Sequence, residues 1–157
     1  MRFSWKHVLL VVIVLAWLAL DRYTKGLFVG MQPGESLGPI LGGLVDLRLV
    51  HNTGGAWGIF AGNTLALGVF SIVVVGAILT FFFRAQSVNL LQTIGVALVA
   101  AGGIGNAIDR FMQGYVTDFL AVTFIDFPVF NVADIGVTCG VALLLIGTFM
   151  ELSKPVK

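Results

Sequence analysis

The sequence predicts an all-α membrane protein of four transmembrane helices, with a small extracytoplasmic β-sheet element between helices 1 and 2. Three observations lead to this prediction. Of the 157 residues, 58% are hydrophobic and only 11% are charged, whereas about a quarter of the residues in a soluble domain carry a charge. Four stretches each contain the roughly 20 mostly apolar residues that a helix needs to cross a bilayer. The charged residues divide unevenly between the two sides of the membrane. We therefore expect one polytopic domain over residues 1–157.

The four expected spans differ little in length. The first covers residues 5–27 and contains an unbroken apolar block at residues 8–20. We expect it to remain as a membrane helix, because cleavage after Ala19 as a signal peptide would put Trp17 where a small residue is needed. The other three spans cover residues 64–83, 89–108 and 130–152.

Four spans place both termini and the loop at Arg84 on one side of the membrane, and segments 28–63 and 109–129 on the other. The side with the termini carries five basic residues and the single acid Glu151, whereas the other side carries four basic and seven acidic residues. Because basic residues favour the cytoplasmic side, we expect cytoplasmic N- and C-termini. Nearly all acidic groups then lie at the outer face.

The outer segment 28–63 combines turns with one strand pattern. Turn-forming residues dominate positions 32–43, whereas residues 44–50 alternate apolar side chains with Asp46 and Arg48. That period of two predicts a strand with one solvated face. A short sheet lying on the membrane surface is therefore expected.

Five polar clusters lie in or beside the spans, where ionisable groups are costly. The first is residues 21–25 (DRYTK), in which Asp21 and Lys25 are four residues apart and share a helix face. The second is residues 51–56 (HNTGGA), whose glycines allow close approach of a ligand and whose Asn52 can bond a peptide backbone. An anchoring ion pair and a plain turn are the structural alternatives for these two clusters.

The third cluster, residues 102–110 (GGIGNAIDR), closes the third span. Gly102 and Asn106 share a helix face with Arg110 one turn further on, and the small residues permit close helix contact. Helix packing explains the glycines. A structural network between Asp109 and Arg110 is an alternative to a catalytic role for this acid.

The last two clusters each contain an acid. In residues 116–119 (VTDF), Asp118 lies among apolar neighbours, where loss of solvent raises the pKa of a carboxyl group. In residues 127–134 (FPVFNVAD), Asn131 and Asp134 begin a helix on one face. Capping explains Asn131 well, but it explains Asp134 less well because an almost wholly apolar span follows.

Paired carboxylates are the chemistry that these clusters favour. Two acids at a membrane boundary share one proton, since like charges a few ångströms apart repel in a low dielectric. The ionised acid can then take a proton from water, and the protonated acid can donate to a developing oxyanion. The residues alone do not decide whether Asp109 or Asp118 belongs to such a pair.

Other chemistries find little support. Ser71 lies in the second span and Ser87 in the cytoplasmic loop, so neither is expected within reach of His51. Cys139 lies inside the fourth span, and we expect it to be a small core residue. Two histidines and one cysteine leave little material for a zinc site. We therefore expect no metal or cofactor, and the net charge of +1 gives no reason to expect a nucleic-acid partner.

Taken in order, the five clusters resemble the lipoprotein signal peptidase (signal peptidase II) family. The matching motifs are D-x-x-x-K, N-x-G-x-A, G-N-x-x-D-R, V-x-D-F and F-N-x-A-D, and they extend from the first span to the last. Two small departures are Thr117 within V-x-D-F and Trp57 where Phe is common.

This resemblance implies an intramembrane aspartyl endopeptidase of the bacterial inner membrane. Its implied reaction removes the signal peptide from diacylglyceryl-modified prolipoproteins by cutting just before the lipidated cysteine. It implies Asp118 and Asp134 as the catalytic pair, prolipoproteins and membrane lipids as partners, and we expect a monomer. The implied supporting or substrate-contacting positions are Asp21, Lys25, Asn52, Gly54, Ala56, Gly102, Asn106, Asp109, Arg110, Asn131 and Ala133.

A small ion or proton transporter or channel subunit is the alternative function, with the acids and Arg110 forming a relay. Transport favours ionisable groups at mid-membrane on several helices, whereas here they gather at the outer ends. A structural assembly factor is a third alternative, and it predicts that single Asp substitutions leave every activity intact.

Overall fold

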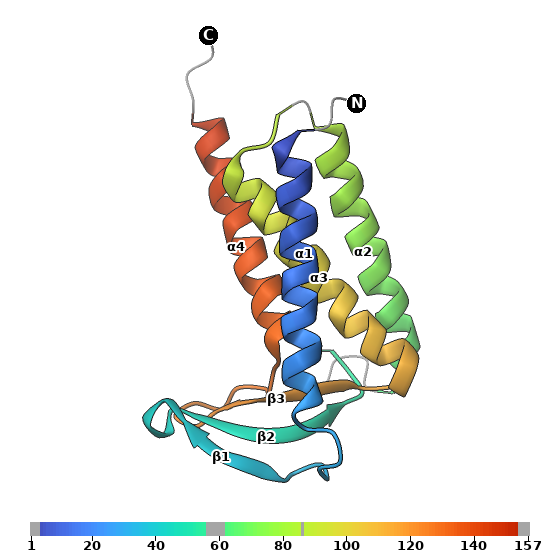
Figure 1. The fold of residues 1–157 in the computed structure, drawn as a ribbon, viewed down its shortest axis with the longest axis vertical. Helices are drawn as coiled ribbons and strands as arrows, with labels where there is room; N and C mark the ends of the chain where they lie inside the picture. Colours follow the sequence, from blue (N-terminus) through green and yellow to red (C-terminus); the bar gives the residue numbers. More distant parts are fainter. Residues whose placement is uncertain (1–3, 56–61, 86, 154–157) are drawn as a thin grey trace.

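The computed structural model describes residues 4–55, 62–85 and 87–153. Within these residues, four long helices form a bundle and three strands form a sheet across one end of it (Figure 1). All four helices are long and apolar enough to cross a membrane, which confirms the predicted fold class. In chain order the elements are α1 (Trp5–Gly26), β1 (Ser36–Ile40), the 3-10 turn η1 (Leu41–Gly43), β2 (Val45–Asn52), α2 (Thr64–Arg84), α3 (Leu90–Gln113), β3 (Val116–Val122) and α4 (Val132–Leu152).

The third helix extends further than the sequence predicted. It was expected to end at residue 108, but it continues to Gln113, so Asp109 and Arg110 lie within its last turns. It ends where Gly114 adopts a left-handed backbone with φ of 78°, as glycine commonly does after a helix. Hydropathy marked where the apolar stretch ends, whereas the helix continues until its backbone hydrogen bonding is interrupted.

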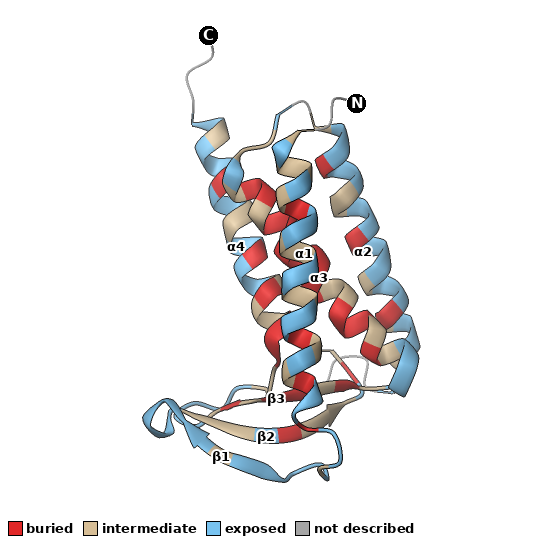
Figure 2. Ribbon diagram, viewed as in Figure 1, coloured by how far each residue is buried: buried red, intermediate tan, exposed pale blue. Residues whose placement is uncertain are grey.

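Helix α3 is the centre of the bundle and packs against the other three helices. Most of its residues are buried, whereas α1, α2 and α4 expose large apolar side chains on their outer faces (Figure 2). Among the described glycines, Gly102 leaves the least space, because an added Cβ would lie 2.2 Å from the carbonyl oxygen of Ala133 in α4. The close helix contact predicted for Gly102 is therefore confirmed.

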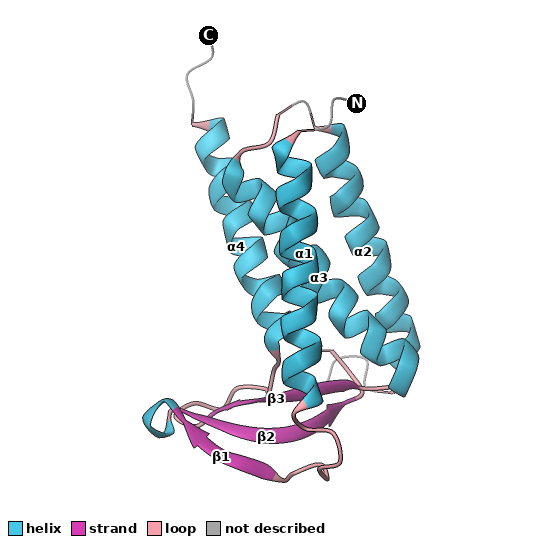
Figure 3. Ribbon diagram, viewed as in Figure 1, coloured by secondary structure: helices cyan, strands magenta, loops and turns pink. Residues whose placement is uncertain are grey.

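The sheet has the antiparallel order β1-β2-β3 and lies across the end of the bundle (Figure 3). Its third strand comes from the connection between α3 and α4, so the sheet is not confined to the connection between helices 1 and 2 as predicted. Residues on β3 are buried on both faces, so the strand lacks the clean alternation that identified β2. Pro39 was expected in a turn but lies in the edge strand β1, where a missing N–H is tolerated.

Strand β3 connects the sheet to α4. Val50 of β2 lies opposite Asp118 of β3. Leu120 and Phe130 exchange backbone hydrogen bonds of 2.8 and 3.1 Å just before α4 begins. These pairings hold Asp118 between β2 and the first turn of α4.

Candidate active site

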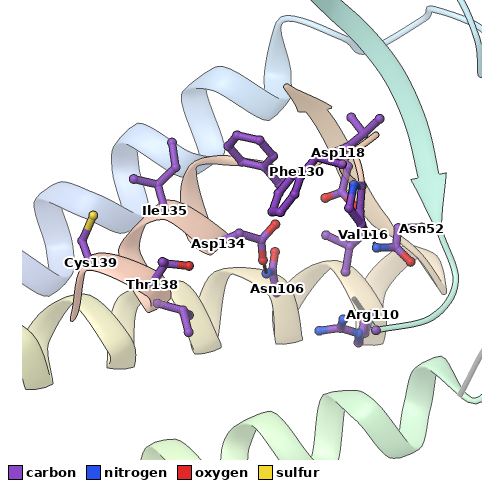
Figure 4. A pocket seen from close by; sticks show the side chains of 15 residues that line it. Asn52, Asn106, Arg110, Val116, Asp118, Phe130, Asp134, Ile135, Thr138 and Cys139 are labelled. Atoms are coloured by element: carbon purple, nitrogen blue, oxygen red, sulfur yellow. Dashed lines mark hydrogen bonds between the residues drawn. The ribbon is translucent and has the colours of Figure 1, made fainter. Parts of the chain in front are cut away.

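Asp118 and Asp134 meet where β3 approaches the start of α4 (Figure 4). Asn131 bonds both acids: its side-chain Nδ2 donates to Asp118 Oδ1 at 2.6 Å, and its backbone N–H donates to Asp134 Oδ2 at 3.1 Å. Asn131 also caps α4, since its Oδ1 accepts from the backbone N–H of Asp134 at 3.0 Å. The cap predicted from the sequence is confirmed, and it also brings the two carboxyl groups to one residue.

Asn52 bonds the second oxygen of Asp118 from strand β2. Its Nδ2 donates to Asp118 Oδ2 at 2.9 Å, while its Oδ1 accepts from the backbone N–H of Gly54 at 2.9 Å. A backbone N–H can only donate, so it fixes the direction of the Asn52 amide. The predicted N-x-G motif therefore orients a donor toward the acid.

Asn106 plays the same part for Asp134 from helix α3. Its Nδ2 donates to Asp134 Oδ1 at 2.7 Å, and its Oδ1 accepts from Lys25 Nζ and Asn131 Nδ2, each at 3.0 Å. The ammonium group of Lys25 can only donate hydrogen bonds. Asn106 must therefore turn its oxygen toward Lys25 on α1 and its NH₂ group toward Asp134. All four carboxyl oxygens of the two acids thus accept an N–H.

A cluster of charges between α1 and α3, buried except for Arg22, supports this arrangement. Lys25 lies 2.9 Å from both Asp21 and Asp109, and Arg22 lies 2.5 Å from Asp109. The predicted ion pair between Asp21 and Lys25 is confirmed. Asp109 does lie in a structural network, the alternative to a catalytic role for this acid, but its ion-pair partners are Lys25 and Arg22 on α1 rather than Arg110. Successive helix residues point in different directions, so Asp109 and Arg110 do not share a face.

Arg110 turns toward the cavity instead (Figure 4). Its Nη2 donates to the carbonyl oxygen of Gly54 at 3.3 Å. Its buried Nε has no hydrogen-bond partner among the described residues. Arg110 therefore adds positive charge and a donor beside the two acids.

The remaining predicted positions shape the backbone. Ala133 is fully buried, and its N–H donates to Asp21 Oδ1 at 3.0 Å, which ties the start of α4 to α1. Gly102 in α3 provides the space for α4 to lie close to α3 at Ala133. Ala56 and Trp57 lie outside the described residues.

A cavity of about 410 Å³ contains the two acids. Its polar end is formed by Asp118, Asp134, Asn52, Asn106 and Arg110. Phe127 to Phe130 and one face of α4 form most of the remaining wall, together with Gly55 and Val116. The cavity therefore combines a pair of carboxyl groups with an apolar surface.

Comparison with known proteins assigns the chain to a family. Residues 13–150 match the family described as Signal peptidase (SPase) II. The chain belongs to the signal peptidase II family. Similar proteins include a lipoprotein signal peptidase from Microcystis aeruginosa, 36% identical with 91% of this chain and 93% of that protein covered, and one from Brevibacillus brevis, 36% identical with 96% and 98% covered.

Solved structures agree with this assignment. A bacterial membrane enzyme determined by the in meso method at 2.3 Å resolution aligns with a TM-score of 0.85 and 31% identity, covering 94% of each chain. A second such structure, at 1.9 Å resolution, aligns with a TM-score of 0.79. The chain is thus a multi-pass membrane protease of bacterial type, which favours the predicted protease over the transporter alternative.

Within this site, the pKa of Asp118 departs from its ordinary value. Burial, together with the neighbouring charge of Asp134, raises the pKa of Asp118 to about 7. Hydrogen bonds from Asn52 and Asn131 and the charge of Lys25 oppose that rise in pKa. Asp118 therefore changes protonation near neutral pH.

Some residues around the cavity were not identified from the sequence. Cys139 was expected to be a buried core residue, but it is exposed and lines the cavity beside Thr138. Hydropathy cannot distinguish a core position from one facing a cavity in a membrane helix. The position of Thr138, four residues after Asp134, was a usable signal because such residues share a helix face. No comparable pattern in the sequence indicated that Arg22 would form an ion pair with Asp109.

Proposed function

We propose that this chain is an intramembrane aspartyl endopeptidase that removes the signal peptide from diacylglyceryl-modified prolipoproteins, cutting just before the lipidated cysteine. The observation that carries this proposal is the bonding of both Asp118 and Asp134 to Asn131 within one cavity. The relatives' name, lipoprotein signal peptidase, supports the substrate class. The supporting positions proposed from the sequence, apart from Ala56, contribute bonds or space around this pair.

The two acids have different surroundings, which supports different roles. Asp134 lies in the first turn of α4, where it accepts the backbone N–H of Asn131 and where the helix dipole favours a negative charge. Asp118 is only 1% exposed, and burial disfavours its charged form. We therefore assign Asp134 as the ionised base and Asp118 as the acid that carries the shared proton.

The charge balance of the surrounding region supports one shared proton. Four acids (Asp21, Asp109, Asp118 and Asp134) and three cations (Arg22, Lys25 and Arg110) gather between the helix ends. Charges that are poorly solvated need compensation nearby. A single proton on the pair makes this set neutral.

The proposed reaction uses this pair twice. Asp134 takes a proton from water as the water oxygen attacks the scissile carbonyl carbon, and Asp118 donates its proton to the carbonyl oxygen. Asp134 then gives its proton to the leaving nitrogen as the C–N bond breaks. Asp118 recovers a proton from the tetrahedral diol as the carboxyl product forms, so the pair again holds one proton.

The location of the site suits a substrate that is itself a membrane helix. The acids lie at the end of the bundle that carries the sheet, which we place at the outer face from the charge distribution. Arg110 and Asn52 offer donors to a peptide backbone at the polar end of the cavity. The sheet limits access of bulk water, and one protomer supplies both acids, which is consistent with a monomeric enzyme.

One assay tests this function. The purified protein is incubated with a prolipoprotein peptide that carries diacylglyceryl on its cysteine and with the same peptide lacking the lipid. We expect cleavage before the cysteine of the lipidated peptide and little cleavage of the other. Absence of cleavage together with a proton or ion flux in vesicles would favour the transporter alternative.

A further inference from the structure

We propose that Trp17 is a positioning residue for Asp134 and acts through a peptide group in the first turn of α4. The inference rests on the proposed function for the catalytic roles of Asp118 and Asp134. It adds a residue that lies outside the five polar clusters. Trp17 lies in the apolar part of α1, four residues before Asp21. As far as the structure describes the cavity, Trp17 does not line it.

Two side chains of α1 bond the two ends of one peptide group at the start of α4. Trp17 Nε1 donates to the carbonyl oxygen of Val132 at 3.0 Å. Asp21 Oδ1 accepts from the N–H of Ala133 at 3.0 Å. This carbonyl and this N–H belong to the same peptide group, which is planar and rigid. The orientation of that group sets the direction in which α4 begins, immediately before Asp134.

The directions of the two helices suit this arrangement. Helix α1 runs toward the sheet and α4 runs away from it (Figure 1). Carbonyl groups in a helix point toward its C-terminus and N–H groups toward its N-terminus, so in α4 the carbonyl points away from the sheet and the N–H toward it. Trp17 and Asp21 share a face of α1 one turn apart, with Trp17 further from the sheet. Each side chain therefore lies on the side of the peptide group that its hydrogen bond requires.

The hydrogen-bonding groups involved have few alternatives. An indole N–H can only donate, and an N–H without a partner is costly inside a membrane protein. A carbonyl oxygen has two lone pairs, so that of Val132 can accept the indole N–H in addition to a backbone N–H of α4. The N–H of Ala133 is one of those that the start of a helix leaves without a backbone partner. Helix α1 thus completes the hydrogen bonding that the cap at Asn131 leaves open.

The indole ring adds a steric contact on the same turn. An added Cβ at Gly136 would lie 2.4 Å from Trp17 Nε1 and 3.0 Å from its Cδ1. Gly136 is four residues after Val132 and therefore shares its helix face. Trp17 also packs against a buried apolar cluster that includes Val132 of α4 and Phe119 of β3. One side chain thus holds the first turn of α4 both by a hydrogen bond and by packing.

Trp17→Phe tests the hydrogen bond, because it removes the indole N–H and keeps an aromatic ring. Asp134 should then be held less closely to its partners, so we expect the single-turnover rate on the lipidated peptide to fall about tenfold. The half-saturating peptide concentration should change less than about twofold, because Trp17 does not line the described cavity. The melting temperature in detergent should fall by no more than about 4 °C. Trp5→Phe, the same change at the exposed start of α1, is the matched control and should leave all three values unchanged.

The alkaline limb of the pH profile distinguishes positioning from a loss of packing. Asp134 faces Asp118 from α4, while Lys25 and Arg110 face it from α1 and α3. The charge of Asp134 contributes to the raised pKa of Asp118, and this contribution weakens if the start of α4 shifts away. Trp17→Phe should therefore move the alkaline limb to lower pH by about half a unit. A variant that only unfolds more easily would leave the limb in place.

Gly136→Ala tests the same contact from α4. The added methyl group must displace the indole ring, so the rate and the alkaline limb should change as they do in Trp17→Phe. In the Trp17→Leu background no ring is left to displace. Adding Gly136→Ala to that background should therefore lower the rate by less than about twofold, which is the non-additivity expected of residues in contact.

The outcomes separate this inference from the proposed function. If the wild-type protein does not cleave the lipidated peptide, the proposed function fails and the inference fails with it. If the wild-type protein cleaves it, a wild-type rate in Trp17→Phe overturns the inference alone. A lower rate with an unmoved alkaline limb makes Trp17 a packing residue and also overturns it. Should Trp17→Phe not fold, Gly136→Ala decides, and an unmoved limb in that variant or an equal loss of rate in the Trp17→Leu background overturns the inference.

Discussion

Three asparagines control the hydrogen bonding of the two acids. Asn52, Asn106 and Asn131 each turn an NH₂ group toward a carboxyl oxygen because a group that can only donate holds the amide oxygen. For Asn106 that group is the ammonium of Lys25, itself held by two buried carboxylates. The charge cluster between α1 and α3 thus contributes to the orientation of the acids without touching them.

The raised pKa of Asp118 predicts how cleavage depends on pH. Asp118 acts in its protonated form, so the rate should fall as pH rises through about 7, the pKa to which burial and Asp134 raise this group. The hydrogen bond from Asn52 opposes the rise, so Asn52→Ala should move the alkaline limb to higher pH. The check is the pH dependence of kcat on the lipidated peptide for both proteins. An alkaline limb that stays in place, or moves to lower pH, would contradict Asp118 as the acid.

Sequence reasoning identified most residues of the site but fewer of their partners. The ion pair of Asp21 with Lys25 and the cap at Asn131 followed from spacing along one helix. The partner of Asp109 lies on another helix, and no local pattern encodes which way an acid points when two helices pack. Cys139 was misjudged for the related reason that hydropathy does not report what a membrane helix faces.

At the scale of elements, the contact between α3 and α4 fixes the distance between Asn106 and Asp134. Glycines on both helices make this contact: a Cβ at Gly95 would lie 2.7 Å from the carbonyl oxygen of Gly140, and one at Gly102 would lie 2.2 Å from that of Ala133. Because the atom that an added Cβ would meet is a backbone oxygen, a larger residue at either glycine would displace a helix. The start of α4, with its acid, therefore depends on these small residues.

Gly102→Ala should consequently separate the two helices at the site. We expect a loss of stability of about 1–3 kcal/mol, the usual cost of overpacking, together with reduced cleavage because Asp134 shifts from Asn106. Gly76→Ala in α2 is the control, since an added Cβ there meets nothing within 4 Å. Thermal unfolding in detergent and the cleavage rate would be measured for both. Equal behaviour of the two variants would argue against a tight α3–α4 contact.

The helices were predictable from the sequence and the sheet only in part. Four apolar stretches of membrane length leave few alternative folds. Strand β2 alternates apolar residues with Asp46 and Arg48 in its sequence and so has a visible period of two, whereas β3 packs on both faces and pairs with a strand about 70 positions earlier. Long-range pairing of that kind has no signature in the local sequence.

At the scale of the whole molecule, the acids gather at one end of the bundle and Arg84 lies at the other (Figure 1). The end of the bundle that carries Arg84 and both termini has an excess of basic residues, which predicts that this end is cytoplasmic. A reporter fused after Lys157 or inserted in the loop at Arg84 should read cytoplasmic, and one within residues 32–43 should read external. An external C-terminus would place the acids on the wrong side of the membrane for a secreted precursor.

The central claim is that Asp118 and Asp134 act as one catalytic unit. Asn replaces Asp with little change of shape but removes proton exchange, so Asp118→Asn and Asp134→Asn should each lower the single-turnover rate by at least about 100-fold. The double variant should be no slower than either single variant, because the shared function is already lost.

Asp109→Asn is the matched comparison, because this acid is buried nearby and pairs with Lys25 and Arg22. Breaking a buried ion pair typically costs about 3–5 kcal/mol, so this variant should lose thermal stability along with activity. The deciding measurement is single-turnover cleavage of the lipidated peptide, with the melting temperature in detergent, for all four variants. We predict folded, inactive Asp118→Asn and Asp134→Asn proteins with non-additive losses. Substantial turnover by Asp118→Asn, beside a well-folded but inactive Asp109→Asn, would contradict the account and give Asp109 the catalytic place.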